Sequence, residues 1–383
     1  MTGVDRVELA YLRQLLSLPQ PCFGLVRTVP GVLLLDRRAM AFLRDAAESP
    51  TGLPPPDLWS RMMRRDPAVA AAEAALRKLA IARAPVALSA MMLRRRLPKG
   101  SCYLNVGHSN LGPRMFAAIR RGLRGQIGVV VHDTIPLDHP ELCRPGTSQR
   151  FGQKMRAVAQ AADLAIFTTQ DALSRAEPHF TRFGRMPPAL VSPIGIASAP
   201  LDQPLPEGAS DRPFFLAVGT IESRKNITLL LDVWQQMHAT RAADDVPALV
   251  IAGGRGWMDD AMAKRLDRAA DAGMVVELPN LSDAAIAALM RRAVALLAPS
   301  LAEGFGLPGI EAAALGCPVI CSDLPVFREV LKDYPVYLPP HDRYAWLETI
   351  TTAFAAGNQP GQARQGQKAP TWDDHFKAVL NLL

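Results

Sequence analysis

The chain has 383 residues, of which 49 % are hydrophobic, so its length and composition predict two domains with sizeable cores. No apolar run approaches the ~20 residues that a membrane-spanning helix needs, and the opening MTGVDRVELAYLRQLL lacks the apolar segment of a secretory signal. The cysteines have no metal-ligand spacing, and their odd number and apolar surroundings predict free, buried thiols in a reducing cytoplasm: Cys22, Cys102, Cys143, Cys317 and Cys321.

The positive charge is concentrated in the first half of the chain. Residues 1–200 hold 27 Lys and Arg against 14 Asp and Glu, whereas residues 201–383 hold 16 against 22. No acidic residue occurs from Ala74 to His132. Such a one-sided field favours an anionic partner, a membrane surface or a nucleic acid, over a solvated basic face without a partner. The acidic second half, and the lack of a nucleic-acid-binding motif, argue against nucleic acid.

The first predicted element is a helix, because Leu9, Leu12 and Leu16 have helical spacing. Short apolar runs with the length of strands then alternate with segments of helix length. In the first half these runs are Val32–Leu35, Tyr103–Val106, Gly128–Val131, Leu164–Phe167 and Leu190–Ser192. In the second half they are Phe214–Val218, Leu249–Ala252, Val275–Leu278, Ala295–Ala298, Val319–Cys321 and Val336–Leu338. This alternation predicts parallel sheets built from βαβ units, and therefore an α/β fold.

A linker separates the two series of strands. The stretch SAPLDQPLPEGASDRP is rich in Pro and Gly and has no periodicity. We therefore expect a Rossmann-like N-terminal domain over residues 1–197, a linker over 198–212 and a Rossmann-like C-terminal domain over 213–365. Ligands of such sheets bind at the carboxyl ends of the strands, so the two domains are expected to face one another across a cleft. An α/β domain usually opens with a strand, but here the first predicted element is a helix. Either the first domain lacks its first strand or residues upstream of Met1 are missing, and we favour a truncated start.

The first candidate site follows the strand Phe214–Val218, in the sequence GTIESRKN. Gly219 permits a tight turn, and Asn226 is expected to be the N-cap of the next helix. Arg224 and Lys225 stand just before that helix, whose N-terminus offers free N–H groups and a positive dipole end. This arrangement suits a diphosphate, and the alternative is a pair of solvated cations in a loop.

The second candidate site follows the strand Ala295–Ala298, in the sequence PSLAEGFGLPGIE. Gly304 and Gly306 let backbone N–H groups approach a ligand closely. Glu303 and Glu311 bracket this loop with seven residues between them. Carboxylates accept paired hydrogen bonds, and sugar hydroxyls come in vicinal pairs, so one carboxylate is suited to a sugar and the other to a ribose.

The two segments together resemble glycosyltransferase family 4, whose members are retaining enzymes of the GT-B fold. The likeness rests on GTIESRKN and on EGFGLPGIEAAALGCPVI, and it extends over about residues 213–340. It implies that Arg224 and Lys225 neutralise the diphosphate of a nucleotide sugar, beside Gly219. It implies that Glu303 binds the donor sugar and Glu311 the ribose. The backbone N–H groups that would face the donor are those of Gly304, Phe305, Gly306 and Leu307.

The same resemblance implies that no metal or other cofactor is needed, because the two cations and the helix N-termini take that role. The absence of an Asp-x-Asp motif agrees with this. GT-B chains also send a final helix back to the N-terminal domain, and residues 370–383 have the apolar spacing for it.

The first half resembles the family more loosely. His132 and Asp133 end a buried strand, and the resemblance implies that His132 contacts the donor sugar, orients the acceptor and takes part in catalysis with Arg224, Lys225 and Glu303. Three further residues are candidates on the acceptor side together with Asp133. Gly3 lies where the family has a Gly-rich loop, and Gly107 and His108 lie in a polar loop that has no assigned role.

These observations predict a retaining glycosyltransferase of bacterial surface polysaccharide synthesis. HDTIPLDHPE resembles mannosyltransferase-like members, which favours a GDP-mannose-like donor, with a UDP-sugar as the other choice. The basic N-terminal domain suits a glycan or lipid-linked acceptor at an anionic membrane, and Arg94–Arg96 beside Met91, Met92 and Leu93 resembles an interfacial segment. The enzyme is then cytoplasmic and peripheral on the inner face of the membrane. The alternatives are a nucleotide-sugar epimerase, an inactive nucleotide-binding GT-B scaffold and a nucleic-acid-binding protein.

Overall fold

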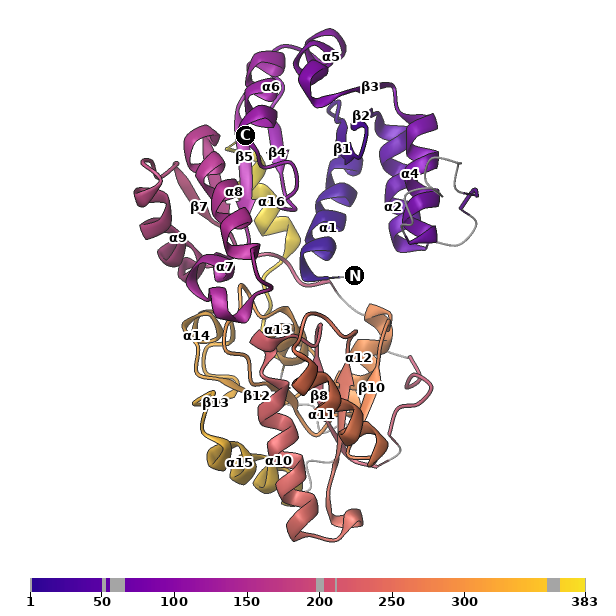
Figure 1. Ribbon diagram of the computed structural model, residues 1–383, viewed down its shortest axis with the longest axis vertical. Coiled ribbons are helices and arrows are strands. Elements are labelled where there is room, and N and C mark those ends of the chain that lie inside the picture. The colour runs from indigo at the N-terminus through magenta and orange to yellow at the C-terminus, as the bar shows by residue number, and fades with distance from the viewer. Residues whose placement is uncertain are drawn as a thin grey trace.

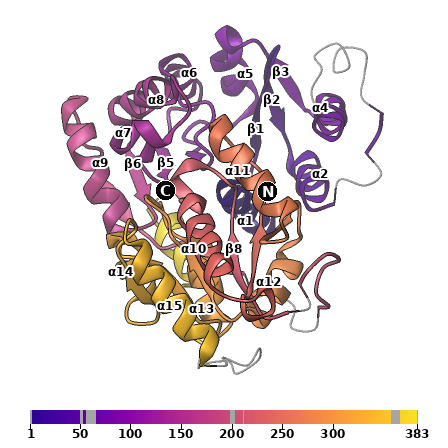
Figure 2. The ribbon, with the colours of Figure 1, turned by 60° about the horizontal axis from the view of Figure 1, so that its bottom comes forward.

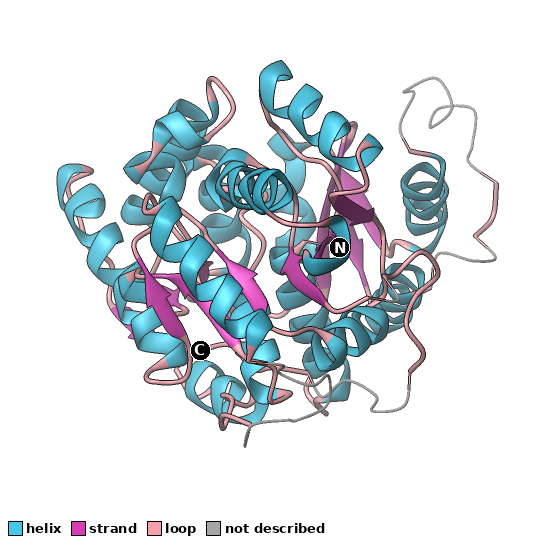
Figure 3. Cartoon of the chain, turned by 90° about the horizontal axis from the view of Figure 1, so that it is seen from below, coloured by secondary structure: helices cyan, strands magenta, loops and turns pink. Residues whose placement is uncertain are grey.

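The computed structural model describes residues 2–49, 53–55, 66–197, 203–210, 212–356 and 366–382. Its helices and strands form two α/β domains, one above the other in Figure 1, with the N-terminal half in the upper one. Viewed from below, helices surround the strands (Figure 3). Part of the expected linker, residues 198–202 and 211, lies outside the described residues.

The C-terminal domain is built on a sheet of six parallel strands. Its order is β10-β9-β8-β11-β12-β13, so the direction of winding changes between β8 and β11. The strands correspond to the six runs expected in the second half: β8 (Phe214–Val218), β9 (Ala248–Ala252), β10 (Val275–Leu278), β11 (Leu296–Ala298), β12 (Val319–Ser322) and β13 (Val336–Leu338). In such an order the loops on either side of the change of winding open into a crevice, where ligands bind.

Helices cover both faces of this sheet. Side chains alternate along each strand, so Phe215 and Ala217 of β8 face one apolar cluster while Phe214 and Leu216 face the other. The first cluster is closed by α10 (Ile227–Thr240), α11 (Asp260–Asp271) and α15 (Arg343–Ala355). The second is closed by α12 (Asp283–Arg292), α13 (Leu307–Ala314) and α14 (Pro325–Leu331). Two short 3₁₀ turns, Ser223–Lys225 and Ala243–Asp245, complete the domain.

The N-terminal domain contains a parallel sheet of four strands in the order β4-β5-β6-β7. These strands are β4 (Tyr103–Asn105), β5 (Ile127–Val131), β6 (Leu164–Phe167) and β7 (Ala189–Val191). The helices around them are α5 (Ser89–Arg96), α6 (Pro113–Leu123), α7 (Ile135–Asp138), α8 (Thr147–Ala161) and α9 (Gln170–Arg182), with 3₁₀ turns at Val86–Leu88 and Pro140–Leu142. Val129 and Val131 pack against the helices, whereas Val130 faces a cluster that continues into the C-terminal domain.

The expectation that Val32–Leu35 belongs to a parallel sheet is wrong. This run lies in β2 (Gly31–Leu35), which pairs antiparallel with β1 (Gly24–Thr28) and β3 (Ala82–Ala84) in a separate sheet. Figure 2 shows this sheet beside α2 (Arg37–Glu48) and α4 (Pro67–Leu79), away from α7 to α9. Both faces of β2 are buried, and a continuous apolar run does not distinguish a buried antiparallel strand from a parallel one.

The first and the last helix of the chain contact one another in the N-terminal domain. Helix α1 (Gly3–Ser17) contacts α16 (Trp372–Leu380), and the Tyr11 hydroxyl lies 2.7 Å from His375 Nε2 in a buried contact. On its other side, His375 Nδ1 lies 3.0 Å from the hydroxyl of Ser192, which follows β7. In Figure 1 the yellow helix α16 accordingly lies in the upper domain, beside α1. A side chain at Gly195 would overlap Trp372, so the chain after β7 passes directly against the start of α16.

Two expectations about individual side chains are only partly correct. All five cysteines are free, but just Cys317 and Cys321 are buried, and Cys102 is exposed. In α5 the arginines Arg94–Arg96 are exposed, whereas Met92 and Leu93 belong to the apolar core. The apolar face expected at a membrane is therefore used by the fold, and Met91 is the exposed apolar member of that segment.

Candidate active site

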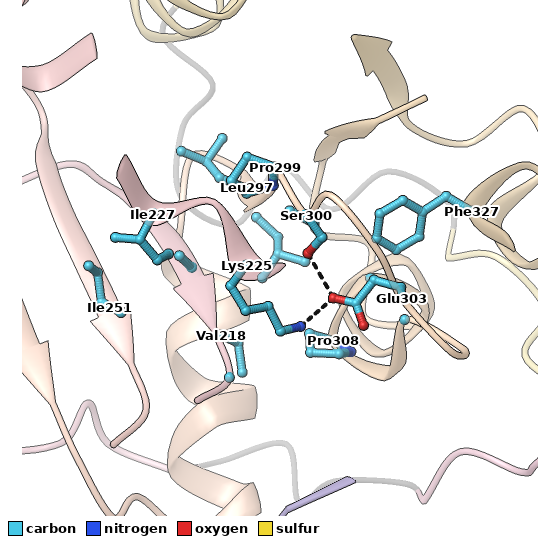
Figure 4. Close-up of a pocket in the computed structure, with 16 residues that line it drawn as sticks. Val218, Lys225, Ile227, Ile251, Leu297, Pro299, Ser300, Glu303, Pro308 and Phe327 are labelled. Carbon is cyan, nitrogen blue, oxygen red and sulfur yellow. Dashed lines mark hydrogen bonds and ion pairs between the residues drawn. The ribbon is translucent and has the colours of Figure 1, made fainter. Parts of the chain in front are cut away.

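A charged cluster lies where the loops after β8 and β11 meet. The Glu303 carboxylate accepts hydrogen bonds from Lys225 Nζ, from Arg224 Nη1 at 3.0 Å and from the Ser300 hydroxyl at 2.7 Å. The contacts from Lys225 and Ser300 are drawn in Figure 4. Arg224 Nε lies 2.7 Å from Glu222 on its other side. Because β8 and β11 are neighbours, residues 78 positions apart in sequence come within hydrogen-bonding distance.

Glu303 is ionised at neutral pH although its side chain is almost completely buried. The Glu303 side chain is 7 % exposed, and burial alone would raise its pKa. The charges of Lys225 and Arg224 and the hydrogen bonds from Lys225 and Ser300 outweigh that effect and hold the pKa at about 2. Burial likewise disfavours the charged form of Arg224, but Glu303, Glu222 and Asp133 keep its pKa above the ordinary arginine value.

Asn226 precedes α10 as expected, but its side chain does not cap that helix. It adopts the left-handed conformation, with φ of 53°, and makes no capping hydrogen bond. Its amide instead donates to the carbonyl oxygens of Pro299 at 3.1 Å and Pro340 at 2.9 Å. Asn226 therefore ties the loop after β8 to the loop after β11, and so helps to fix Lys225 against Glu303.

The glycines of both loops are placed close to functional groups. Gly219 has φ of 128°, and a side chain there would approach Lys225 Cε to 3.2 Å. Gly306 has φ of 78° and begins α13, with the ring of Phe327 beneath it. A small pocket lies between these two loops, and its lining includes Gly219, Lys225, Ser300, Glu303, Gly306 and Phe327 (Figure 4).

Gly304 is the point at which this loop touches the N-terminal domain. A Cβ atom at Gly304 would lie 3.0 Å from Asp133 Oδ2 and from the backbone oxygen of His132. Burial raises the pKa of Asp133, although Arg224 and His132 oppose the shift, and the carboxylate accepts a hydrogen bond from Ile135 N at 3.1 Å. The structure thus brings Asp133 and the backbone of His132 directly to the Glu303 loop.

His132 and His108 form a buried pair behind this contact. Their ring centroids are 5.1 Å apart, and His108 Nε2 accepts a hydrogen bond of 3.4 Å from His132 N. His132 Nε2 lies 2.7 Å from the Val106 carbonyl oxygen. Burial lowers the pKa of both histidines, that of His108 to about 3 with help from His132 and Lys154, so both are neutral at physiological pH.

Glu311 contacts the N-terminal domain as well. It accepts a hydrogen bond from the Arg6 guanidinium of α1, which also lies 3.4 Å from Asp283. Burial raises the pKa of Glu311, and Arg6 opposes that shift. A Cβ atom at Gly3 would lie 3.4 Å from Leu307, so the first turn of α1 faces the first turn of α13. Arg6 is not identifiable from the sequence, because a single arginine on an amphipathic helix is ordinary.

The remaining predicted residues lie close to this region. The backbones of Phe305 and Leu307 follow Gly304, while the Phe305 side chain is buried in the core. Gly107 precedes His108 and is covered by Glu8 of α1. Within the described ranges, no three His, Cys, Asp or Glu side chains are grouped as a metal site.

Two parallel-sheet domains that contact one another at the loops of a charged crevice define the GT-B fold. Residues 204–372 match the family profile of glycosyl transferases group 1, so the C-terminal domain is similar to members of that family. The serotype-specific mannosyltransferase WbdA of Escherichia coli is 31 % identical over 227 residues, which are 54 % of this chain and 27 % of WbdA. The O-antigen chain mannosyltransferase B of the same species is 35 % identical over 130 residues, 34 % of this chain and 33 % of the relative.

These alignments cover about a third or less of either relative. One solved structure aligns with a larger part of this protein, over 95 % of this chain and 86 % of the chain in that structure. It is an α,α-trehalose-phosphate synthase from Burkholderia xenovorans, with 14 % identity and a TM-score of 0.53. At this identity the likeness concerns the fold, and it confirms the expected α/β architecture of two Rossmann-like domains.

We predict that Glu303→Gln destabilises the protein in a pH-dependent manner. The pKa of Glu303 is lowered in the folded state, so its contribution is present above its ordinary value of 4.5 and is lost as the pH falls toward 2. The variant should lose about 3 kcal/mol of unfolding free energy at pH 7, and this difference should shrink below about pH 4.5. Urea unfolding between pH 7 and 3.5 measures it. A difference in unfolding free energy between variant and unmodified protein that stays constant with pH would contradict the lowered pKa of Glu303. The control is Glu48→Gln, which changes the exposed partner of an ion pair with Arg13.

We predict that Arg6→Ala weakens the contact between the domains. The Arg6 side chain is 24 % exposed and that of Glu311 is 12 % exposed, so removal of the guanidinium leaves a nearly buried carboxylate unpaired. The expected loss is about 2 kcal/mol of unfolding free energy. Arg13→Ala, on the same helix, removes the exposed pair with Glu48 and should cost less than about 1 kcal/mol. Equal losses in the two variants, measured by urea unfolding, would refute an interdomain role.

Proposed function

We propose that the protein is a retaining glycosyltransferase that moves a sugar from a nucleotide-diphosphate sugar to a hydroxyl group of a glycan or lipid-linked acceptor. The observation that carries the proposal is the buried cluster of Glu303, Lys225 and Arg224 beside Asp133 of the opposite domain. It supplies two fixed cations next to a fixed carboxylate, at the place where a parallel sheet binds ligands.

In this proposal the donor lies along the loop from Glu303 to Glu311. Lys225 and Arg224 bind the diphosphate, and Glu303 accepts hydrogen bonds from the sugar hydroxyls. The backbone N–H groups of Gly304 to Leu307 face the sugar and phosphate, and Glu311 holds the ribose. The likeness to mannosyltransferases supports a GDP-mannose-like donor, whereas the structural relative from Burkholderia is described as UDP-forming, so a UDP-sugar is the second choice.

The reaction then proceeds on one face of the sugar. The bond between the anomeric carbon and the diphosphate oxygen breaks as the acceptor oxygen forms its bond on the same face, which retains the configuration. The acceptor proton passes to an oxygen of the leaving phosphate, so no protein base is needed. Charge accumulates on the diphosphate as it leaves, and Lys225 and Arg224 stabilise it without a metal ion. Neutral His132 contacts the sugar through its imidazole or backbone.

The acceptor side of the proposal rests on charge. The exposed arginines Arg94–Arg96 and the basic composition of residues 1–200 suit an anionic membrane surface and an acceptor that carries phosphates. Relatives named for O-antigen chains support a role in bacterial surface polysaccharide synthesis. No helix in the described part of the chain is long and apolar enough to span a bilayer. We propose a cytoplasmic enzyme, peripheral on the inner face of the membrane, without a nucleic-acid partner.

Two other functions use the same fold. An inactive scaffold would bind a nucleotide without turnover, and an epimerase would convert the donor without an acceptor. The complete set of Arg224, Lys225, Glu303 and Glu311 favours an active transferase over a scaffold. Conversion of the nucleotide sugar into its epimer in the absence of an acceptor would favour the epimerase instead.

A panel of nucleotide sugars tests the donor site. One class among UDP-, GDP-, ADP- and CMP-sugars should raise the melting temperature by about 3 °C or more at 100-fold excess over Kd, because the ligand binds only the native state. EDTA should not change the shift. The variant Arg224→Ala, Glu303→Ala should lose it, whereas Arg328→Ala, which removes an exposed pair with Asp323, should keep it. No shift with any nucleotide would overturn the proposal.

Vesicle sedimentation tests the membrane surface. The protein should sediment with phosphatidylglycerol vesicles at low salt and remain in solution with phosphatidylcholine vesicles. Replacing Arg94, Arg95 and Arg96 by Gln should reduce the bound fraction several-fold, and raising the salt to about 0.5 M should release the protein. Absence of binding to anionic vesicles at low salt would remove the membrane from the proposal.

A further inference from the structure

Glu8 of α1 lies directly on Gly107, at the start of the loop that follows β4. A Cβ atom at position 107 would overlap the Glu8 carboxyl group and would lie 3.0 Å from its Cγ. The backbone of Gly107 does not have a positive φ, so its conformation does not demand glycine. Glycine at 107 is required here for space, and the group that fills the space is a carboxylate.

This carboxylate differs from the others near the domain interface. Glu303, Glu311 and Asp133 each accept a hydrogen bond from a side chain or a backbone amide. The Glu8 side chain has neither a hydrogen bond nor an ion pair with any described residue, and the residue remains accessible to solvent. Partial burial of its carboxylate against Gly107, and then the charge of Asp5, raise its pKa, so the carboxylate is less well hydrated than an ordinary surface carboxylate.

The position of Glu8 joins the two halves of the candidate active site. Two residues before it, Arg6 binds Glu311 of the donor loop. Gly107, which Glu8 touches in space, precedes His108 in the chain. His108 accepts a hydrogen bond from the backbone N–H of His132. Glu8 is therefore on the N-terminal side of the interface, one helical turn or less from the contact with Glu311 and against the loop that carries His108.

We propose that the Glu8 carboxylate binds hydroxyl groups of the acceptor sugar, from a position for which Gly107 leaves room. A carboxylate that makes no hydrogen bond within the protein accepts hydrogen bonds from the hydroxyls of a sugar, and it repels phosphate. The ligand of this subsite is therefore an uncharged sugar ring, and any phosphate of the acceptor lies farther out, toward the basic surface. The proposal rests on the proposed function but concerns the acceptor, not the donor.

Binding of simple glycosides tests the subsite directly. The probes are methyl α-mannoside, methyl α-glucoside and methyl α-galactoside, and binding is measured by saturation-transfer NMR. The unmodified protein should bind at least one of them, and Glu8→Ala should bind it about tenfold more weakly, with Glu8→Gln in between. The control Glu48→Ala removes an exposed carboxylate of α2 and should leave binding unchanged.

Gly107→Ala gives a second test that does not remove the carboxylate. The added methyl group should displace the flexible Glu8 side chain and weaken glycoside binding as Glu8→Ala does. The double variant Glu8→Ala, Gly107→Ala should be no weaker than either single one, because both changes act on the same group. This non-additivity distinguishes the subsite from general damage to the fold.

The outcomes separate this proposal from the donor assignment. Nucleotide-induced stabilisation should be the same in the variants of Glu8 and Gly107 as in the unmodified protein, since neither residue is in the donor loop. Glycoside binding that survives Glu8→Ala, or an unmodified protein that binds none of the probes, overturns the subsite. If no nucleotide stabilises the unmodified protein, the donor proposal is refuted instead. Glycoside binding can still be measured in that case, so the subsite is tested independently.

Discussion

The buried ion cluster around Glu303 is the interaction on which the rest of the site depends. Two cations and a carboxylate are expensive to remove from water, and their mutual attraction compensates that cost only while all of them stay in place. Glu303 meets Lys225 and Arg224 because β8 and β11 are adjacent at the change of winding. The amide of Asn226, in the loop after β8, donates to Pro299 in the loop after β11 and to Pro340 after β13. The charges are therefore fixed before any ligand arrives, which is the condition for stabilising a developing charge without reorganisation.

The two domains are linked by residues that also belong to the site. Gly304 touches Asp133, and Glu311 is paired with Arg6 from the opposite domain. A ribose at Glu311 would share this carboxylate with Arg6, so donor binding and the contact between the domains act on one group. On the far side of the interface, the Glu329 carboxylate accepts hydrogen bonds from the first backbone amides of α9, at 2.7 and 2.9 Å. Negative charge is favourable at that helix N-terminus, and the interface is thus held at several separate points.

The sequence predicts the C-terminal domain better than the N-terminal one, for a physical reason. Its strands are short β-rich runs between helices, and its loops carry glycines and charged residues whose spacing reflects local backbone geometry. The same local signal fails for β2, because both faces of that strand are buried and its partner strands are antiparallel. It also fails for Met92 and Leu93, which lie beside three arginines but face the core. Arg6 and Glu8 have no local signature, since what distinguishes them is a contact with residues far away in the chain.

The electrostatic character of the two sides of the interface is different, and in the proposed function this difference would orient the donor. On the C-terminal side, the half-buried Arg224 keeps its pKa above the ordinary arginine value, and Lys225 pairs with Glu303 beside it. On the N-terminal side, burial lowers the pKa of His132 and His108, so they carry no charge, and it raises the pKa of Asp133. A diphosphate beside Glu303 would therefore meet the cations Lys225 and Arg224, while the histidine pair of the opposing domain would offer hydrogen bonds without charge. An uncharged sugar ring is suited to lie between them, with its reactive carbon turned toward the N-terminal domain.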